Sequence, residues 1–157
     1  MPNNSNKLHV ETSVKDESLI EVRRRQIIIA GVKLFKEKGF HRATTREIAK
    51  AAGFSIGTLY EYIRTKEDVL YLVCDSIFNE VMKRLSTFPT NSGTVEELAE
   101  AIKQYFLLID SMFDEFTIMY QETKSLPKEA MHYVLNKELE MVALFEDILR
   151  SCIKSGE

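Results

Sequence analysis

The sequence predicts an all-α protein in which a small amino-terminal three-helix head is joined to a larger helical bundle. Three observations support this fold class. Apolar residues recur at helical spacing along most of the 157 residues, and no stretch alternates convincingly with the period of two that marks a strand. Polar capping patterns precede the apolar segments. The chain has only six Gly and three Pro, which leaves little room for long loops.

The first helix is predicted over residues 18–38. Its apolar positions, which include Ile27 and Phe35, recur at helical spacing, and Gly39 ends the pattern. Residues 1–17 are polar and aperiodic, so we expect them to form a flexible arm.

Two short helices are predicted next. The pattern from Thr44 to Glu47 has the form of a capping box, in which each side chain bonds the backbone amide of the other residue. The short helix that this box opens ends at Gly53. Ser55 offers an N-cap oxygen for the following helix, predicted over residues 55–63.

A long helix connects the two parts of the molecule. Thr65 caps it, and it runs to the loop-rich stretch 86–94, which has the composition of a boundary. We assign residues 18–65 to the head and residues 66–157 to the bundle, with this helix bridging both.

Three more helices are predicted in the carboxy-terminal half. Thr94 opens a second capping-box pattern, and the helix that follows changes phase near Phe113. A further helix reaches about Glu122. Pro127 suits the first turn of a final helix that runs to near Lys154.

Composition is that of a soluble globular protein, with 45% hydrophobic and 29% charged residues. The longest apolar run, residues 27–32, is far too short to cross a bilayer, and the amino terminus lacks the blocks of an export signal. We therefore expect a cytoplasmic protein without membrane segments. Cys74 and Cys152 lack the spacing of a metal site and are expected to be small buried hydrophobes.

The net charge of −3 hides an asymmetry between the two halves. Residues 20–66 hold eleven Lys and Arg against four Glu, a balance of +7. Residues 86–157 hold six basic and thirteen acidic side chains, a balance of −7. This separation indicates that the first half meets a polyanion such as nucleic acid, although a solvated surface could also segregate charge.

The predicted helix 55–63 is a poor core helix, because its apolar residues form a single narrow stripe. As the second helix of a helix-turn-helix, it would enter the major groove of duplex DNA. Gly57 would let the backbone approach the duplex, and the hydroxyls of Ser55 and Thr58 could bond phosphates or base edges. A tyrosine on each flank of the stripe could lean on the sugar-phosphate wall. Each of these side chains could instead serve only packing or capping.

The stretch TTREIAKAAGFSIGTLYEYIRTKEDVL, residues 44–70, resembles the signature of the TetR family of bacterial transcriptional regulators. The preceding AGVKLFKEKGFHRAT is similar to the family's first helix and turn, so the resemblance covers about residues 20–75. It implies a homodimer that binds a palindromic double-stranded DNA operator. Glu61 could read a cytosine amino group or repel wrong registers. The positions that contact DNA by this resemblance are Thr45, Ser55, Ile56, Gly57, Thr58, Tyr60, Tyr62 and Lys66.

The bundle is rich in large soft side chains, which by themselves indicate a helical core. Members of the TetR family enclose an inducer in the equivalent helices, so the resemblance implies a pocket for a small apolar or amphipathic effector. The stretch MYQETKSLPKE, residues 119–129, is similar to members that respond to fatty acyl-CoA. The side chains expected to line the pocket are Tyr105, Met112, Phe116, Met119, Tyr120 and Tyr133.

Together these features predict a ligand-responsive repressor that leaves its operator when the pocket fills. The alternative is an architectural or nucleoid-associated DNA-binding protein without an inducer. Enzymatic activity and a cofactor are not expected, because no nucleophile, base and acid occur at informative spacing and no glycine-rich phosphate loop appears. Family members continue for two helices that form the dimer interface. Either this chain, which stops at Glu157, is short, or dimerisation uses another surface.

Overall fold

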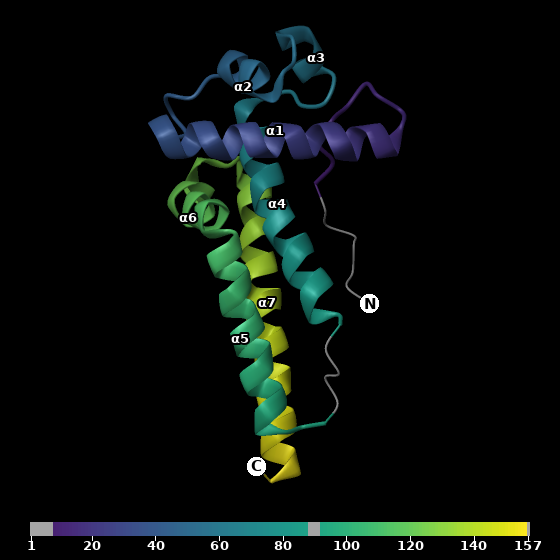
Figure 1. Ribbon diagram of the computed structural model, residues 1–157, viewed down its shortest axis with the longest axis vertical. Coiled ribbons are helices and arrows are strands. Elements are labelled where there is room, and N and C mark those ends of the chain that lie inside the picture. Colours follow the sequence, from purple (N-terminus) through teal and green to yellow (C-terminus); the bar gives the residue numbers. More distant parts are fainter. Residues whose placement is uncertain (1–7, 88–91, 157) are drawn as a thin grey trace.

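The computed structural model describes residues 8–87 and 92–156, and all regular structure in these residues is helical, as predicted. Part of the predicted loop 86–94, residues 88–91, lies outside the described ranges. Figure 1 shows α1 lying across one end of the molecule, with α2 and α3 on its outer side and the longer helices on the other. The elements are α1 (Glu17–Lys38), α2 (Thr45–Ala52), α3 (Ile56–Tyr60), α4 (Lys66–Leu85), α5 (Val95–Ser111), α6 (Phe113–Glu122), the 3-10 helix η2 (Thr123–Ser125) and α7 (Lys128–Ser155).

The predicted capping residues Thr44, Gly53, Ser55 and Thr65 bound the short helices of the head and the start of α4. The Glu47 amide donates to Thr44 Oγ1 (3.2 Å), and the Thr44 amide donates to Glu47 Oε2 (3.0 Å), which completes the capping box of α2. Thr65 and Asp68 form the same reciprocal arrangement at the start of α4. Gly53 adopts a left-handed conformation (φ 79°, ψ 25°), which closes α2 and turns the chain into α3.

α3 is shorter than the predicted helix 55–63 and ends at Tyr60. The amide of Glu61 bonds the carbonyl of Thr58 (3.1 Å), an i to i+3 bond of the kind that tightens a last helical turn. The chain then passes inward toward the head's core before α4 begins, and this change of direction decides the position of Tyr62.

α4 is shared by the head and the bundle. Its first turn packs under α1, where Gly31 allows a close approach: a Cβ at Gly31 would lie 2.5 Å from Val69 Cγ1. Ile27, Ile48 and Leu59 are fully buried and fill the space between the three head helices and α4. Further along, α4 contacts α5, α6 and α7, so one helix carries the core from the head into the bundle.

The segment before α1 is packed against the head from residue 8 onward, which corrects the expected flexible arm there. Val10 is 5% exposed, and its carbonyl accepts a hydrogen bond from the Arg24 guanidinium (2.6 Å). The Thr12 hydroxyl donates to the carbonyl of Glu61 (2.7 Å). These contacts join residues that are distant in sequence, so no local periodicity indicates them. The earlier part of the predicted arm, residues 1–7, lies outside the described residues.

α5 and α7 run side by side to the end of the molecule farthest from the head (Figure 1). A small buried cluster of Ala101, Ile148 and Cys152 joins them. Much of the remaining apolar surface of these helices is exposed: Phe106 is 65% and Leu139 is 67% exposed. The bundle therefore ends in a two-helix arm with an uncovered apolar surface.

Both cysteines are free and buried, as the sequence predicts. Burial raises the pKa of the Cys74 thiol to about 12, so it stays protonated at neutral pH. Within the described ranges, no helix combines the length and the hydropathy needed to cross a membrane.

Candidate DNA-binding surface and effector groove

α2 and α3 form a compact helix-turn-helix on the side of α1 that faces away from the bundle (Figure 1). Leu59 and Ile63 are fully buried and anchor α3 and the turn after it to the head. The opposite side of α3 faces out of the molecule. A helix held in this way can enter a DNA groove without rearrangement of the rest of the head.

The outward side of α3 carries little side-chain bulk. Ser55 and Gly57 are exposed and Thr58 is half-buried. A Cβ at Gly57 would meet a single heavy atom within 4 Å among the described residues, the Ser55 Oγ at 3.8 Å. That oxygen accepts from the Thr58 amide and donates to its Oγ1, each at 3.0 Å. We refer to Ser55, Gly57 and Thr58 as the bare edge of α3.

Thr45 and Tyr60 join the start of α2 to the end of α3. Their hydroxyl oxygens lie 3.0 Å apart, within hydrogen-bonding distance. Tyr60 is 40% exposed, so its phenol remains accessible, whereas Ile56 is half-buried against the core. Six of the eight predicted DNA contacts thus lie on these two adjoining helices and their caps: Thr45, Ser55, Ile56, Gly57, Thr58 and Tyr60.

Tyr62 is a correction to the predicted surface, because it is only 3% exposed. Its ring stacks on Phe54 with a centroid distance of 6.4 Å and an interplanar angle of 29°. The prediction placed Tyr62 on the flank of a continuous helix, but α3 ends at Tyr60 and the turn carries the next residues inward. The Tyr62 ring therefore belongs to the core of the head.

The ammonium of Lys66 is engaged within the head. Nζ donates to the carbonyls of Phe40 (2.7 Å) and His41 (3.2 Å), and it lies 4.5 Å from the centroid of the Phe40 ring. These carbonyls accept two of the three ammonium hydrogens of the side chain that the sequence assigned to a DNA phosphate. Lys66 instead holds the turn between α1 and α2 against the start of α4.

Arg46 and Lys50 are exposed cations of α2 that the sequence analysis did not single out as DNA contacts. In the part of the chain that the structure describes, neither forms an ion pair. Lys38, by contrast, is paired with Glu47 at 2.6 Å, and this bond together with the Thr44 cap lowers the pKa of the Glu47 carboxyl. A charge count finds the positive excess of the head but cannot separate free cations from paired ones.

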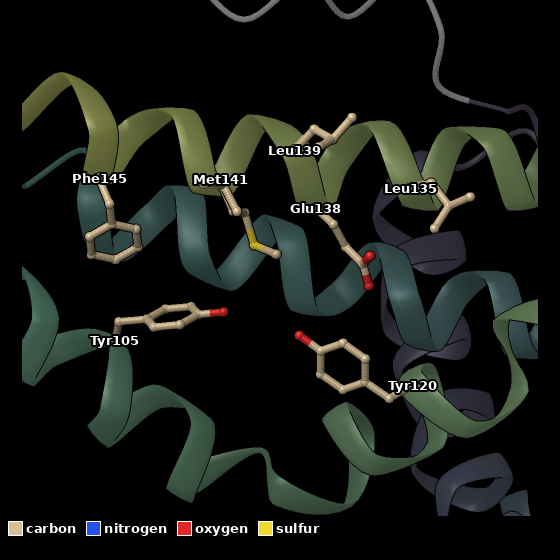
Figure 2. A pocket seen from close by; sticks show the side chains of 8 residues that line it. Tyr105, Tyr120, Leu135, Glu138, Leu139, Met141 and Phe145 are labelled. Atoms are coloured by element: carbon tan, nitrogen blue, oxygen red, sulfur yellow. The ribbon is translucent and has the colours of Figure 1, made fainter.

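Tyr105 and Tyr120 lie in a second candidate site, a groove of about 400 Å³ between α5, α6 and α7. Figure 2 shows both tyrosine hydroxyls pointing into the space beside α7, toward Glu138. The rings of Tyr105 and Phe145 meet edge to face, 5.2 Å apart. The lining residues are Tyr105, Tyr120, Leu135, Glu138, Leu139, Met141, Val142 and Phe145.

The other four predicted effector contacts do not line this groove. Phe116 and Met119 are buried in the core, and Met112 lies beside a separate cavity next to α1. The buried Tyr133 hydroxyl donates to Asp75 Oδ1 at 2.8 Å, which ties α7 to α4. All four side chains belong to the hydrophobic core or pack against it.

Six of the eight lining residues were not among the predicted effector contacts, and Glu138 is the charged one among them. It is half-buried, and burial raises the pKa of its carboxyl. Burial, followed by the charge of Glu138, also raises the pKa of the Tyr120 phenol. A signal was present in the sequence, because Glu138 follows Leu135 by three positions and precedes Val142 by four, on one side of the helix.

α6 connects the groove to the head. Lys36 of α1 pairs with Asp114 at 2.9 Å, and the His41 ring lies 3.6 Å from Glu122. Both carboxylates belong to α6, the helix that carries Tyr120. A displacement of α6 at the groove would therefore act on both contacts with the head.

The fold and these two surfaces define a helix-turn-helix protein of the regulatory class, with a helical effector bundle attached to the head. A family model described as "Bacterial regulatory proteins, tetR family" matches residues 27–71, and one described as "Tetracyclin repressor-like, C-terminal domain" matches residues 91–157. The chain belongs to the tetR family. This is a family of regulators rather than enzymes, in agreement with the sequence analysis.

Two relatives illustrate the similarity. The HTH-type transcriptional regulator HbdR of Aromatoleum sp. (strain CIB) is 33% identical over 151 residues, which cover 94% of this chain and 65% of HbdR. The Fatty acid metabolism regulator protein of Bacillus subtilis (strain 168) is 29% identical over 134 residues, 84% of this chain and 69% of that protein. The chain thus spans 65% of the length of the first relative and 69% of the second.

Solved structures have the same fold. A bacterial regulatory protein of the tetR family from Rhodococcus RHA1 matches with a TM-score of 0.78 and 21% identity, over 85% of this chain and 71% of that one. FadR of Thermus thermophilus, a TetR-family transcriptional repressor solved in complex with lauroyl-CoA, matches with a TM-score of 0.51 and 26% identity, over 85% and 69% of the two chains.

Proposed function

We propose that this protein is an effector-responsive transcriptional repressor that binds a near-palindromic duplex operator as a homodimer in the cytoplasm. The observation that carries the proposal is the bare edge of α3, an exposed glycine between two hydroxyl side chains on the second helix of a helix-turn-helix. The net positive charge of the head supports the same partner.

The proposed contacts divide between the sugar-phosphate backbone of the DNA and the edges of its bases. Gly57 lets the α3 backbone approach the duplex, and the hydroxyls of Ser55 and Thr58 can donate to phosphates or base edges. Tyr60, oriented by Thr45, lies against the sugar-phosphate wall. The free cations of α2 add a salt-dependent attraction to the phosphates. Tyr62 and Lys66 act indirectly, by packing and by holding the turn before α2.

Two copies are required for tight binding, because one three-helix head contacts few bases. A two-fold dimer would place its α3 helices in successive major grooves, about 34 Å apart. Filling the groove in the bundle would change this spacing and so release the DNA.

α6 and α4 are the helices through which the groove would act on the head. α6 lines the groove with Tyr120 and touches the head through Asp114 and Glu122. α4 begins in the head and packs on α6 and α7. Coupling of this kind is typically about 1–3 kcal/mol, enough to change operator affinity by about 5- to 150-fold.

The proposed effector is small and largely apolar. A groove of about 400 Å³ lies within the size range of small-molecule sites, and its walls are mainly aliphatic and aromatic. An acyl chain, such as that of a fatty acyl thioester, fits such walls. Two relatives support this class: one is called a fatty acid metabolism regulator, and the other was solved with lauroyl-CoA.

Selection from random-sequence duplex DNA tests the DNA-binding part of the proposal. We expect recovery of a near-palindromic site whose affinity falls steeply with salt. Gly57→Leu should bind that site at least about tenfold more weakly and keep the wild-type unfolding temperature, since its side chain points away from the core. Asn136→Leu, at an exposed position of α7, is the matched control and should bind normally.

Wild-type affinity of the Gly57→Leu protein would contradict the contact surface. Titration of the specific complex with small molecules then separates a repressor from its alternative. A site-specific complex that no small molecule weakens would identify an architectural DNA-binding protein instead.

A further inference from the structure

We infer that the groove takes an amphipathic cation, an apolar molecule with an amine or quaternary ammonium head held by Glu138 between Tyr105 and Tyr120. This inference rests on the proposed function, because it assigns the chemical class of the effector. It differs from the fatty acyl thioester considered above in the charge of the polar end.

The charge of the groove favours a cation. Glu138 is the single charged side chain among the eight described lining residues. Within the described ranges it forms no hydrogen bond or ion pair, whereas its neighbour Glu140 is exposed and paired with Lys137 at 2.8 Å. A half-buried carboxylate without a partner loses hydration and gains nothing in return, so a bound cation would supply the missing interaction.

The aromatic side chains favour the same ligand. Tyr105 packs edge to face with Phe145 (5.2 Å) and Phe116 (6.4 Å), which fixes the orientation of its ring beside the groove. Figure 2 shows the Tyr105 and Tyr120 rings on the side of the space opposite Glu138. Their hydroxyl oxygens point into this space and can face a cation, and the carboxylate on the opposite side adds a full negative charge. An anionic head would be repelled by the Glu138 carboxylate.

The remaining walls suit an apolar body. Leu135, Leu139, Met141 and Val142 extend along α7 on both sides of Glu138 and offer only aliphatic or thioether surface. Leu139 and Val142 are 67% and 63% exposed, so an alkyl chain lying on them would remove apolar surface from water. Thus the groove has one charged position inside an apolar strip, the pattern of an amphipathic ligand.

Calorimetric titration of the whole chain with three probes of equal alkyl length tests the inference. The probes are decyltrimethylammonium, decanoate and decanoyl-CoA, each kept below its micellar concentration. We expect decyltrimethylammonium to bind the tightest. Glu138→Gln should weaken that binding by about tenfold or more, while binding of decanoate stays equal or improves.

The matched control is Glu140→Gln, which removes the same charge from the same helix but outside the groove. It should leave the affinity for decyltrimethylammonium within about twofold of wild type. Tyr105→Phe is a second variant, which removes the hydroxyl and keeps the aromatic ring. It should retain the preference for the cation, and it keeps the inference testable if Glu138→Gln lowers the unfolding temperature. Loss of the preference in Tyr105→Phe at an unchanged unfolding temperature would contradict its assignment to the Glu138 charge.

The outcomes separate the inference from the proposed function. Absence of decyltrimethylammonium binding, or tighter binding of decanoyl-CoA that ignores Glu138→Gln, overturns the cationic effector and leaves an effector-responsive repressor intact. Binding of the cation that requires Glu138 but leaves the operator complex unchanged supports the cation site in the groove. It contradicts the proposed regulation of operator binding by an effector.

Discussion

The head and the far part of the bundle differ in how they cover their apolar side chains. In the head, Ile27, Ile48 and Leu59 are fully buried between helices that contact one another on several sides. In the bundle, the two-helix arm of α5 and α7 leaves Phe106 and Leu139 mostly in water. The head is thus complete as a packed unit, and the arm is not.

This difference fits the task proposed for each region. A surface that reads DNA must keep its geometry, and a tightly packed core beneath it holds the helices in place. A region that responds to an effector needs apolar surface that a ligand or a second copy of the chain can cover. The opposite charge balances, +7 over residues 20–66 and −7 over residues 86–157, separate the same two tasks.

The largest expected effect compares the same truncation in both regions. Leu59→Ala should lower the free energy of unfolding by about 2–5 kcal/mol, because it leaves a cavity in the closed core of the head. Leu139→Ala should change it by about 0.5 kcal/mol or less, since that side chain is 67% exposed. Urea unfolding of both variants measures the contrast. Equal losses would show that the arm is packed as tightly as the head in solution.

A second contrast concerns two glycines within the head. Gly31→Ala should destabilise the protein by about 1–3 kcal/mol, because its methyl group would lie 2.5 Å from Val69 Cγ1. Gly57→Ala should keep the stability or raise it by up to about 1 kcal/mol, since alanine favours a helix and meets no wall there. Thermal unfolding distinguishes the two. A destabilised Gly57→Ala would mean that the bare edge of α3 is covered.

Much of the fold could be predicted because its signals are local. The capping box of Thr44 and Glu47, the left-handed Gly53 and the cap at Thr65 each act within a few residues, and the structure forms all of them. Helical periodicity likewise found every longer helix. The contacts of Val10 with Arg24 could not be predicted in the same way, because they join distant segments without a repeating pattern.

The sites were harder to predict, because side-chain roles depend on tertiary packing. Tyr62 and Lys66 have the residue types of DNA contacts, yet the turn after α3 buries the first and two backbone carbonyls bind the second. Glu138 has the type of a solvated surface residue, yet it is half-buried in the groove between α5, α6 and α7. In each case the residue type was informative, and the partner that decided its role came from another helix.

A third prediction separates structural from DNA-binding cations. Lys66→Met should cost about 1–2 kcal/mol of stability, because the carbonyls of Phe40 and His41 lose their donor. Lys50→Gln should leave stability unchanged and lower the salt dependence of operator binding by about one ion. Urea unfolding and binding over a range of salt concentrations measure both quantities. A reversed pattern would return Lys66 to the DNA surface.

The smallest expected effect is a pH dependence confined to the groove. Burial raises the pKa of Glu138, so the neutral acid persists to higher pH than in water, and the carboxylate forms as pH rises through that raised value. The groups that face Glu138 from the neighbouring helices are Tyr105, Tyr120 and Cys74, and burial raises the pKa of each, so they stay neutral in this range.

Affinity for decyltrimethylammonium should therefore increase from acid to neutral pH and then level off, with a total change of about tenfold, comparable to the loss in Glu138→Gln. The ammonium head does not titrate, so the change reports the protein alone. Glu138→Gln should show a flat profile at the weaker affinity, while Glu140→Gln should follow the wild type. A flat wild-type profile would contradict a role for the Glu138 carboxylate in binding the cation. A slope that survives in Glu138→Gln would place the titrating group outside the groove.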